Sequence, residues 1–133
     1  MIKLNSVLKF DEFLSRKGTR EIVDCNTFLD GNWKENTRQN NFPENIRKYI
    51  FPINISYANF VVLTETDAGT EVGPHVHDEP MFRIVIKGCF ELNGTHYNEG
   101  DWVFVPAGMS YEMSSKTGYT TLGCYGVECI KPK

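Results

Sequence analysis

The sequence of 133 residues lacks the features that mark several broad protein classes. It has no apolar run near the roughly 20 residues that span a bilayer, and its N-terminus has no apolar signal-peptide core. Its net charge of −3 excludes the strongly basic surface typical of nucleic-acid binding. Its four cysteines include no CxxC pair, so the spacing does not indicate a zinc ribbon. We therefore expect a cytoplasmic protein that binds neither nucleic acid nor a membrane.

The first part of the chain carries one helical pattern and one long irregular segment. Residues 6–16 are predicted to form a short helix, since Ser6 suits an N-cap and apolar residues recur at helical spacing: Val7, Phe10 and Leu14. Residues 24–45 are rich in Asn, Asp, Thr and Gly and show no period. Three aromatic residues predict that this loop is nevertheless held by packing: Phe28, Trp33 and Phe42.

From about residue 46 onward, short apolar runs alternate with turn residues. The predicted strands are Tyr57 to Thr66, Phe82 to Ile86, Gly88 to Leu92, Thr95 to Tyr97, Trp102 to Val105, residues 109–114 and residues 119–130, while Ile46 to Ile55 is ambiguous. Asn93-Gly94 is the strongest hairpin signal in the chain. Many short strands at this spacing predict one antiparallel sandwich or barrel.

Two of the three histidines stand close together in front of an apolar run. His75 and His77 are two residues apart, and an extended backbone from Pro74 to Val76 would place both imidazoles on the same face. Two imidazoles on one face are the beginning of a metal site or of an acid–base pair. This pair is therefore the leading candidate for chemistry.

Two glycine-anchored blocks resemble the signature motifs of the cupin superfamily. They read Gly69-x5-His75-x-His77 running to Gly88, and Gly100-x5-Pro106-x-Gly108. The resemblance covers about residues 57–128 and implies an all-β, cupin-like jelly-roll β-barrel. We expect a single domain over residues 1–133, in which residues 1–45 form a short N-terminal helix and a covering loop and about 46–130 form the barrel. Small cupins commonly pair through edge strands, so the resemblance also implies a homodimer.

The resemblance further implies four metal ligands, of which this sequence keeps two. The matching positions are His75, His77, Met81 and Tyr111. A thioether and a neutral phenol are poor ligands for the Fe, Mn, Ni or Zn ions that such sites hold. Glu71 or Glu79 would have to help complete a divalent metal site. Three roles for the histidine pair thus stay open: metal binding, metal-free acid–base chemistry, and an inert remnant bonded to water and backbone.

Two further residues are candidates for the site. Tyr111 is either an acid or hydrogen-bond donor, or a packed aromatic with a tethered hydroxyl. If the strand keeps the family's register, Arg83 points into the barrel with Met81 and Val85, where it must be paired or meet an anionic ligand. The alternatives are an opposite register that exposes Arg83 to solvent, or an ion pair with one of three acids: Glu71, Glu79 or Glu112.

Several functions agree with these residues. The first hypothesis is a small-molecule enzyme that acts on a polar or oxygenated metabolite through His75 and His77. It would use either a weakly held divalent metal or metal-free chemistry of the isomerase, dehydratase or cyclase type, with Tyr111 and Arg83 assisting. The alternative is a non-catalytic ligand-binding, metal-binding or sensor domain. A dioxygenase-type cupin with an atypical metal shell, and a structural dimer with a vestigial pocket, complete the set.

Overall fold

The structure of the protein is a computed structural model, and it describes residues 21–39, 42–51 and 60–125. The elements in these ranges are β1 (Val23–Asp24), a 3-10 helix η2 (Phe28–Gly31), α2 (Trp33–Thr37), β2 (Phe60–Thr66), β3 (Thr70–His75), β4 (Met81–Gly88), β5 (Phe90–Leu92), β6 (Thr95–Tyr97), β7 (Trp102–Val105), β8 (Tyr111–Ser115) and β9 (Tyr119–Tyr125). None of the helices in the described ranges is long and apolar enough to cross a membrane. The helix predicted over residues 6–16 lies outside the described residues.

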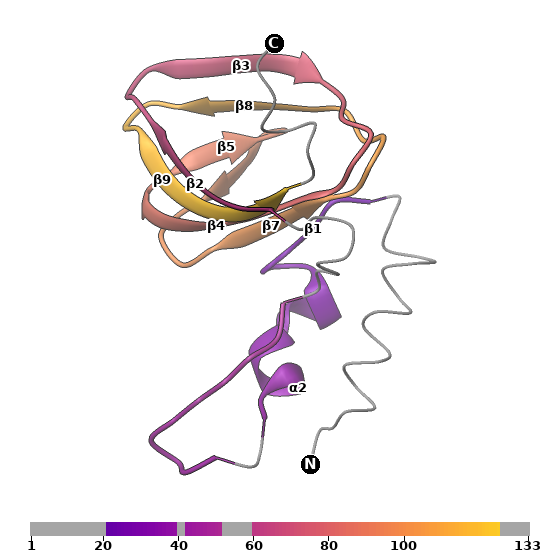
Figure 1. The fold of residues 1–133 in the computed structure, drawn as a ribbon, viewed down its shortest axis with the longest axis vertical. Helices are drawn as coiled ribbons and strands as arrows, with labels where there is room; N and C mark the ends of the chain where they lie inside the picture. Colours follow the sequence, from indigo (N-terminus) through magenta and orange to yellow (C-terminus); the bar gives the residue numbers. More distant parts are fainter. Residues whose placement is uncertain (1–20, 40–41, 52–59, 126–133) are drawn as a thin grey trace.

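The strands form two antiparallel sheets that face each other across the barrel (Figure 1). The first, sheet A, has the order β1-β7-β4-β9-β2, and the second, sheet B, has the order β3-β8-β5-β6. This arrangement confirms the predicted all-β jelly-roll fold. The purple segment that carries η2 and α2 lies outside the barrel, on the side of sheet A (Figure 1).

Side chains that alternate along β4 divide the apolar residues between two clusters. Met81 and Val85 face the barrel interior, whereas Phe82 and Ile84 face outward. The other buried members of the interior cluster are Phe90, Leu92, Tyr97, Val103, Val105, Tyr111, Met113, Tyr119 and Tyr125. The period of two along a strand is sufficient to explain this division.

Glycine is required where the chain passes from sheet A into sheet B. Gly88 ends β4 with a φ of +78°, and a Cβ atom at this position would lie 2.2 Å from the carbonyl oxygen of Gly118. A larger residue would therefore push the two segments apart. The hairpin that follows agrees with its prediction, since Asn93 and Gly94 both have positive φ values and Leu92 pairs with Thr95.

Three parts of the chain differ from the prediction or settle what it left open. The strand β3 was not predicted beyond the extended stretch around His75, although it runs over Thr70–His75 and pairs with β8. Residues 46–51 form no strand, and the rest of the ambiguous stretch lies outside the described residues. The segment 24–45 is not wholly irregular, because it contains η2 and α2.

An aromatic cluster on the outer face of sheet A holds this N-terminal segment. Trp102 is fully buried, and four rings lie with their centroids 5.3 to 5.9 Å from it: Phe28, Trp33, Phe51 and Phe82. Packing by Phe28 and Trp33 is therefore confirmed. Phe42 does not contribute to this packing as predicted, because its side chain is 40% exposed, with the Lys48 ammonium 4.0 Å from its ring centroid.

A buried polar contact adds to this attachment. The Tyr97 hydroxyl donates to the Asp24 carboxylate, which also accepts from the backbone N–H groups of Asn26 (2.8 Å) and Thr27 (3.0 Å). Burial is the main cause that raises the pKa of Tyr97 well above its ordinary range, and the hydrogen bond to Asp24 is the next largest cause. The phenol therefore keeps its proton and continues to donate to β1.

We predict that Trp102→Ala lowers the free energy of unfolding by about 3–5 kcal/mol, because it opens a cavity among four aromatic rings. Urea denaturation measures this change. Trp102→Phe is the matched control: it keeps a ring and removes an indole N–H that has no hydrogen-bond partner in the described ranges, so it should cost much less. Equal, small losses in both variants would contradict the role given to this cluster.

Candidate functional site

The two predicted histidines meet at one end of sheet B. His75 is the last residue of β3, and His77 lies two residues beyond it in the loop that leads to β4. Their ring centroids are 4.9 Å apart, with an interplanar angle of 86°. The ladder between β3 and β8 shifts register between Val72 and His75, and such a shift turns the end of a strand. The structure therefore brings the two imidazoles together.

The hydrogen bond of His75 determines which of its nitrogens is available. Its Nδ1 lies 2.9 Å from the carbonyl oxygen of Gly73. A carbonyl oxygen only accepts, so Nδ1 carries the proton in this contact, and in the neutral ring Nε2 carries the lone pair. Nε2 is thus the nitrogen that can accept a proton or a hydrogen bond from a ligand.

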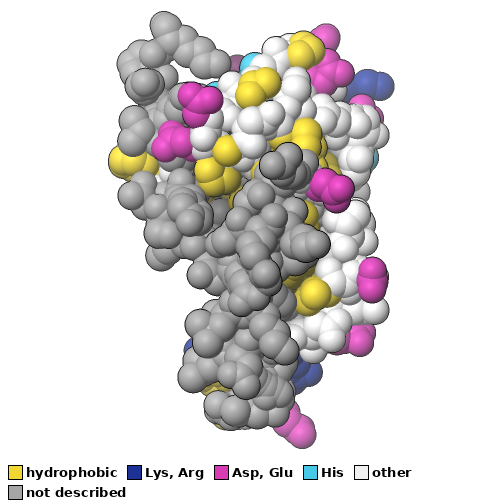
Figure 2. All heavy atoms as spheres, turned by 90° about the vertical axis from the view of Figure 1, so that its right-hand side faces the viewer, with side chains coloured by type: hydrophobic (Ala, Val, Ile, Leu, Met, Phe, Trp, Pro, Cys, Tyr) yellow, Lys and Arg dark blue, Asp and Glu magenta, His cyan; other side chains and the backbone are white. Residues whose placement is uncertain are grey.

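Tyr111 lies directly beside the histidines because β8 pairs with β3. Its register partner is His75, and their ring centroids are 4.3 Å apart, while the His77 ring is 6.1 Å away. Tyr111 is buried, and its hydroxyl lies 3.6 Å from the Met81 sulfur. Both histidines are half-buried. In Figure 2, histidine side chains reach the surface beside hydrophobic and acidic ones.

Arg83 points into the barrel, as the register of β4 predicted. It is 8% exposed and lies between Met81 and Val85 on the inner face, so the alternative of solvent exposure is wrong. In the part of the chain that the structure describes, the guanidinium forms no ion pair with the three acids that were considered, Glu71, Glu79 and Glu112.

The guanidinium is surrounded by sulfur atoms and aromatic rings. Its Nη2 lies 2.9 Å from the Met81 sulfur, and its Nη1 lies 3.4 Å from the Met113 sulfur and 3.3 Å from the Tyr119 hydroxyl. The Phe90 and Tyr125 ring centroids are 5.9 and 5.5 Å from its central carbon. Burial by itself would lower the pKa of Arg83. Electrostatic interactions with Tyr125, Tyr119 and Tyr111 outweigh this effect, so the net pKa is raised and the guanidinium keeps its charge.

The donor atoms near the histidines do not fit a divalent metal centre. Within residues 21–39, 42–51 and 60–125, no group of three or more His, Cys, Asp or Glu side chains is arranged to hold a metal ion. Glu71 is exposed on β3 and Glu79 is half-buried in the following loop. Beyond the two imidazoles, the site offers the Met81 thioether and the Tyr111 phenol, which bind hard or borderline ions poorly.

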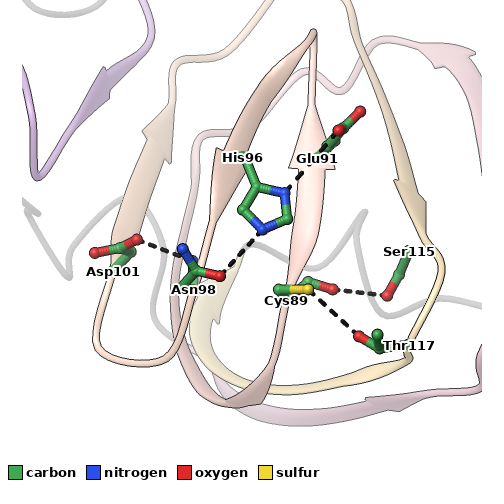
Figure 3. A network of polar contacts seen from close by, with 7 residues as sticks. All are labelled: Cys89, Glu91, His96, Asn98, Asp101, Ser115 and Thr117. Carbon is green, nitrogen blue, oxygen red and sulfur yellow. Dashed lines mark hydrogen bonds and ion pairs between the residues drawn. The ribbon is translucent and has the colours of Figure 1, made fainter.

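The remaining histidine and a half-buried cysteine lie elsewhere. His96 is exposed on β6, where its Nε2 is 3.0 Å from Asn98 Oδ1 and its Nδ1 is 4.0 Å from the Glu91 carboxylate (Figure 3). This exposure agrees with its predicted place beside the hairpin turn. Cys25 is a poor nucleophile, because burial is the main cause that raises its pKa to about 11.

Sequence reasoning missed three buried polar groups around Arg83. The Nε of Arg83, the Oγ1 of Thr121 and the hydroxyl of Tyr125 are buried, and none of the three has a hydrogen-bond partner among the residues that the structure describes. The last two lie on β9, whose register pairs Val85 with Thr121 and Met81 with Tyr125, on either side of Arg83. Only the alternation along β9 could have indicated them.

The comparisons with known proteins give one family model and several solved structures that are similar to this chain. A family model described as the ChrR cupin-like domain matches residues 36–128. Among solved structures, an RmlC-like cupin from Shewanella frigidimarina is 25% identical and matches over 53% of this chain and 69% of that chain, with a TM-score of 0.48. KdgF from Halomonas sp. is 20% identical over 53% of this chain and 73% of that chain, with a TM-score of 0.42.

A third structure contains the protein that gives the family its name. It is Rhodobacter sphaeroides SigE in complex with the anti-sigma ChrR, with 15% identity over 95% of this chain and 68% of that chain, and a TM-score of 0.45. No curated protein matches the sequence. Because the family model spans well over half of the chain, the protein belongs to the ChrR cupin-like family within the cupin superfamily.

Proposed function

We propose that this cupin domain binds a small polar metabolite at the end of the barrel where His75, His77 and Tyr111 meet. The observation that supports this proposal most is the meeting of these three rings, with centroid separations of 4.3 to 6.1 Å at a half-buried position. Imidazole nitrogens can bind the hydroxyl or carbonyl groups of a metabolite, and the ring faces can contact its carbon atoms.

A binding role without turnover agrees with the family, whose name comes from a protein described as an anti-sigma factor. In such a role the ligand would change the stability of the barrel rather than react. A ligand that binds only the folded domain stabilises it in proportion to the logarithm of its concentration. Ligand binding is therefore measurable even where no reaction takes place.

Metal-free catalysis is the second candidate, and the tautomer of His75 favours it. Because Nδ1 donates to the Gly73 carbonyl, Nε2 is the nitrogen that would act as the base. Isomerisation, dehydration and cyclisation all require a proton to leave one atom and return to another, which an imidazole performs near neutral pH. The metal-dependent oxygenase stays the weaker proposal, because the described donor set supplies too few suitable ligands.

We expect His75→Ala and His77→Ala to weaken metabolite binding at least about fivefold, the factor for one lost hydrogen bond. Melting-temperature shifts over a panel of uncharged metabolites will identify a ligand, and calorimetry will give its dissociation constant. His96→Ala is the matched control, since His96 is exposed on β6 away from the site and should leave binding unchanged. Equal affinity in all three variants would remove the histidine pair from the binding site.

The same ligand separates binding from catalysis. Incubation in heavy water, followed by NMR of the recovered ligand, detects exchange of a carbon-bound hydrogen that acid–base catalysis would cause. Exchange that depends on His75 supports the enzyme. An unchanged ligand supports the binding domain.

We expect the protein purified without chelator to contain far less than one metal ion per chain. Of the four ligand positions that the cupin resemblance implies, only His75 and His77 carry a side chain that binds such ions well. Elemental analysis for Fe, Mn, Ni and Zn measures this content. The double variant His75→Ala, His77→Ala gives the background. A stoichiometric metal in the wild type that is absent from the double variant would contradict the metal-free proposal.

We also propose a homodimer that pairs through β2. This strand lies at the edge of sheet A and exposes apolar side chains on one face, with Val61 71% and Leu63 60% exposed. We expect Val61→Lys and Leu63→Lys to shift sedimentation toward the monomer, because a buried lysine at the pairing edge is unfavourable. Ile46→Lys, at an exposed residue outside the sheets, is the control. A wild type that sediments as a monomer contradicts the proposal.

A further inference from the structure

We propose that Arg83 is the subsite for the carboxylate group of the ligand, which we infer to be a small hydroxycarboxylate. This inference rests on the proposed function and adds the chemical class of the ligand. It places the carboxylate inside the barrel at Arg83 and the rest of the ligand toward His75. The carboxylate and the remainder of the ligand would therefore both bind at the same end of the barrel.

The first argument is the charge of Arg83. Among the described residues it is the one buried Lys or Arg, and no carboxylate pairs with it. A buried charge without a partner is strongly unfavourable, so such charges in folded proteins are paired or meet an anion. The interior of this barrel thus carries a positive charge that an anionic ligand would neutralise.

The second argument is the weakness of its present acceptors. Two of the atoms that face the guanidinium are the sulfur atoms of Met81 and Met113, and a thioether is a neutral and weak acceptor. Within the described part of the chain, the Nε–H group has no hydrogen-bond acceptor. The guanidinium therefore keeps unused capacity for the two parallel hydrogen bonds with which arginine binds a carboxylate.

The Met81 sulfur marks the position of the carboxylate. It lies 2.9 Å from Arg83 Nη2 and 3.6 Å from the Tyr111 hydroxyl, so both donors converge on this one atom. A carboxylate oxygen in place of this sulfur would be a charged and much stronger hydrogen-bond acceptor for both donors. Methionine is unbranched and adaptable, so the side chain can move to admit the ligand.

Tyr111 connects this position to the histidines. Its ring lies 4.3 Å from the His75 ring, while its hydroxyl is directed to Met81 on the side of Arg83. A small ligand with its carboxylate at Arg83 therefore extends toward His75. This direction agrees with the ring cluster of the proposed function.

The class of ligand follows from the charge and the hydroxyl groups. One guanidinium balances one negative charge, which favours a single carboxylate over a phosphate dianion. The buried hydroxyl of Tyr125 lies on β9 opposite Met81, on the His75 side of Arg83, and has no hydrogen-bond partner among the described residues, so it can serve a hydroxyl of the ligand. These groups together favour a hydroxycarboxylate.

The test compares acids with their uncharged amides on the full chain. The probes are glycolate and lactate, the matched amides glycolamide and lactamide, and inorganic phosphate, with calorimetry and melting-temperature shifts as readouts. In the wild type, each acid should bind at least about tenfold more tightly than its amide, because the hydrogen bonds are then charge-assisted. Phosphate should bind more weakly than the acids.

Three variants test the residues. Arg83→Met should abolish the preference for acid over amide and should raise the melting temperature without ligand, because an apolar side chain replaces an unpaired buried charge. Arg83→Lys keeps the charge but lacks the fork, so it should bind each acid about tenfold more weakly. Ile84→Val, on the outer face of β4, is the control and should keep the preference.

The outcomes separate this inference from the proposed function. Equal binding of acid and amide, or an unchanged preference in both Arg83 variants, overturns the carboxylate subsite and leaves the role of His75 intact. Phosphate that binds more tightly than the acids, or no acid binding in the wild type, also overturns the subsite. The uncharged panel with His75→Ala decides the proposed function on its own.

Discussion

The alternation of side chains along β4 is the constraint on which both halves of this molecule depend. The strand lies between β7 and β9 in sheet A, so both of its edges are hydrogen-bonded, and a cluster of buried side chains covers each of its faces. Phe82 joins the outer aromatic cluster around Trp102, which attaches the N-terminal segment. Met81 and Arg83 face inward, where sheet B closes over them. A shift of one residue in the pairing register of β4 would exchange its two faces. Both the outer aromatic cluster and the inward position of Arg83 would then be lost.

The barrel interior is therefore not a purely apolar core. A row of polar and polarisable groups runs from the half-buried histidines through Tyr111 and Met81 to Arg83. Three strands supply it, since β3 and β8 position the rings and β4 supplies the charge. Buried polar groups without partners reduce stability, and functional sites are where folded proteins commonly retain such groups. This pattern is the reason to assign binding to the inside of the barrel.

Much of the fold could be predicted from the sequence because its signals are local. Asn93-Gly94 predicts its hairpin, and the two glycine-anchored blocks indicate the barrel and the position of His75. The strand β3 was not predicted because Gly73 and Pro74 argue against strands, although proline is tolerated here since β3 is an edge strand. Phe42 was misjudged because its burial depends on contacts that local sequence does not contain.

The candidate site was predicted less completely, for a different physical reason. The inward direction of Arg83 follows from a period of two, but its neighbours come from β8 and β9, about 30 to 40 positions along the chain. Which side chains meet it depends on the register of strands that pair far apart in sequence. The sequence therefore indicated a buried charge only if β4 kept the family's register, and the structure showed both the burial and that thioethers and phenols, rather than carboxylates, surround the guanidinium.

The most direct test of the account is the NMR signal of the Arg83 Nε–H group, assigned by its loss in Arg83→Lys. Addition of lactate should move this proton downfield, as expected when a donor without a partner gains a charged acceptor, and lactamide should move it much less. A signal that stays unchanged at saturating lactate would contradict the claim that this buried guanidinium receives the ligand.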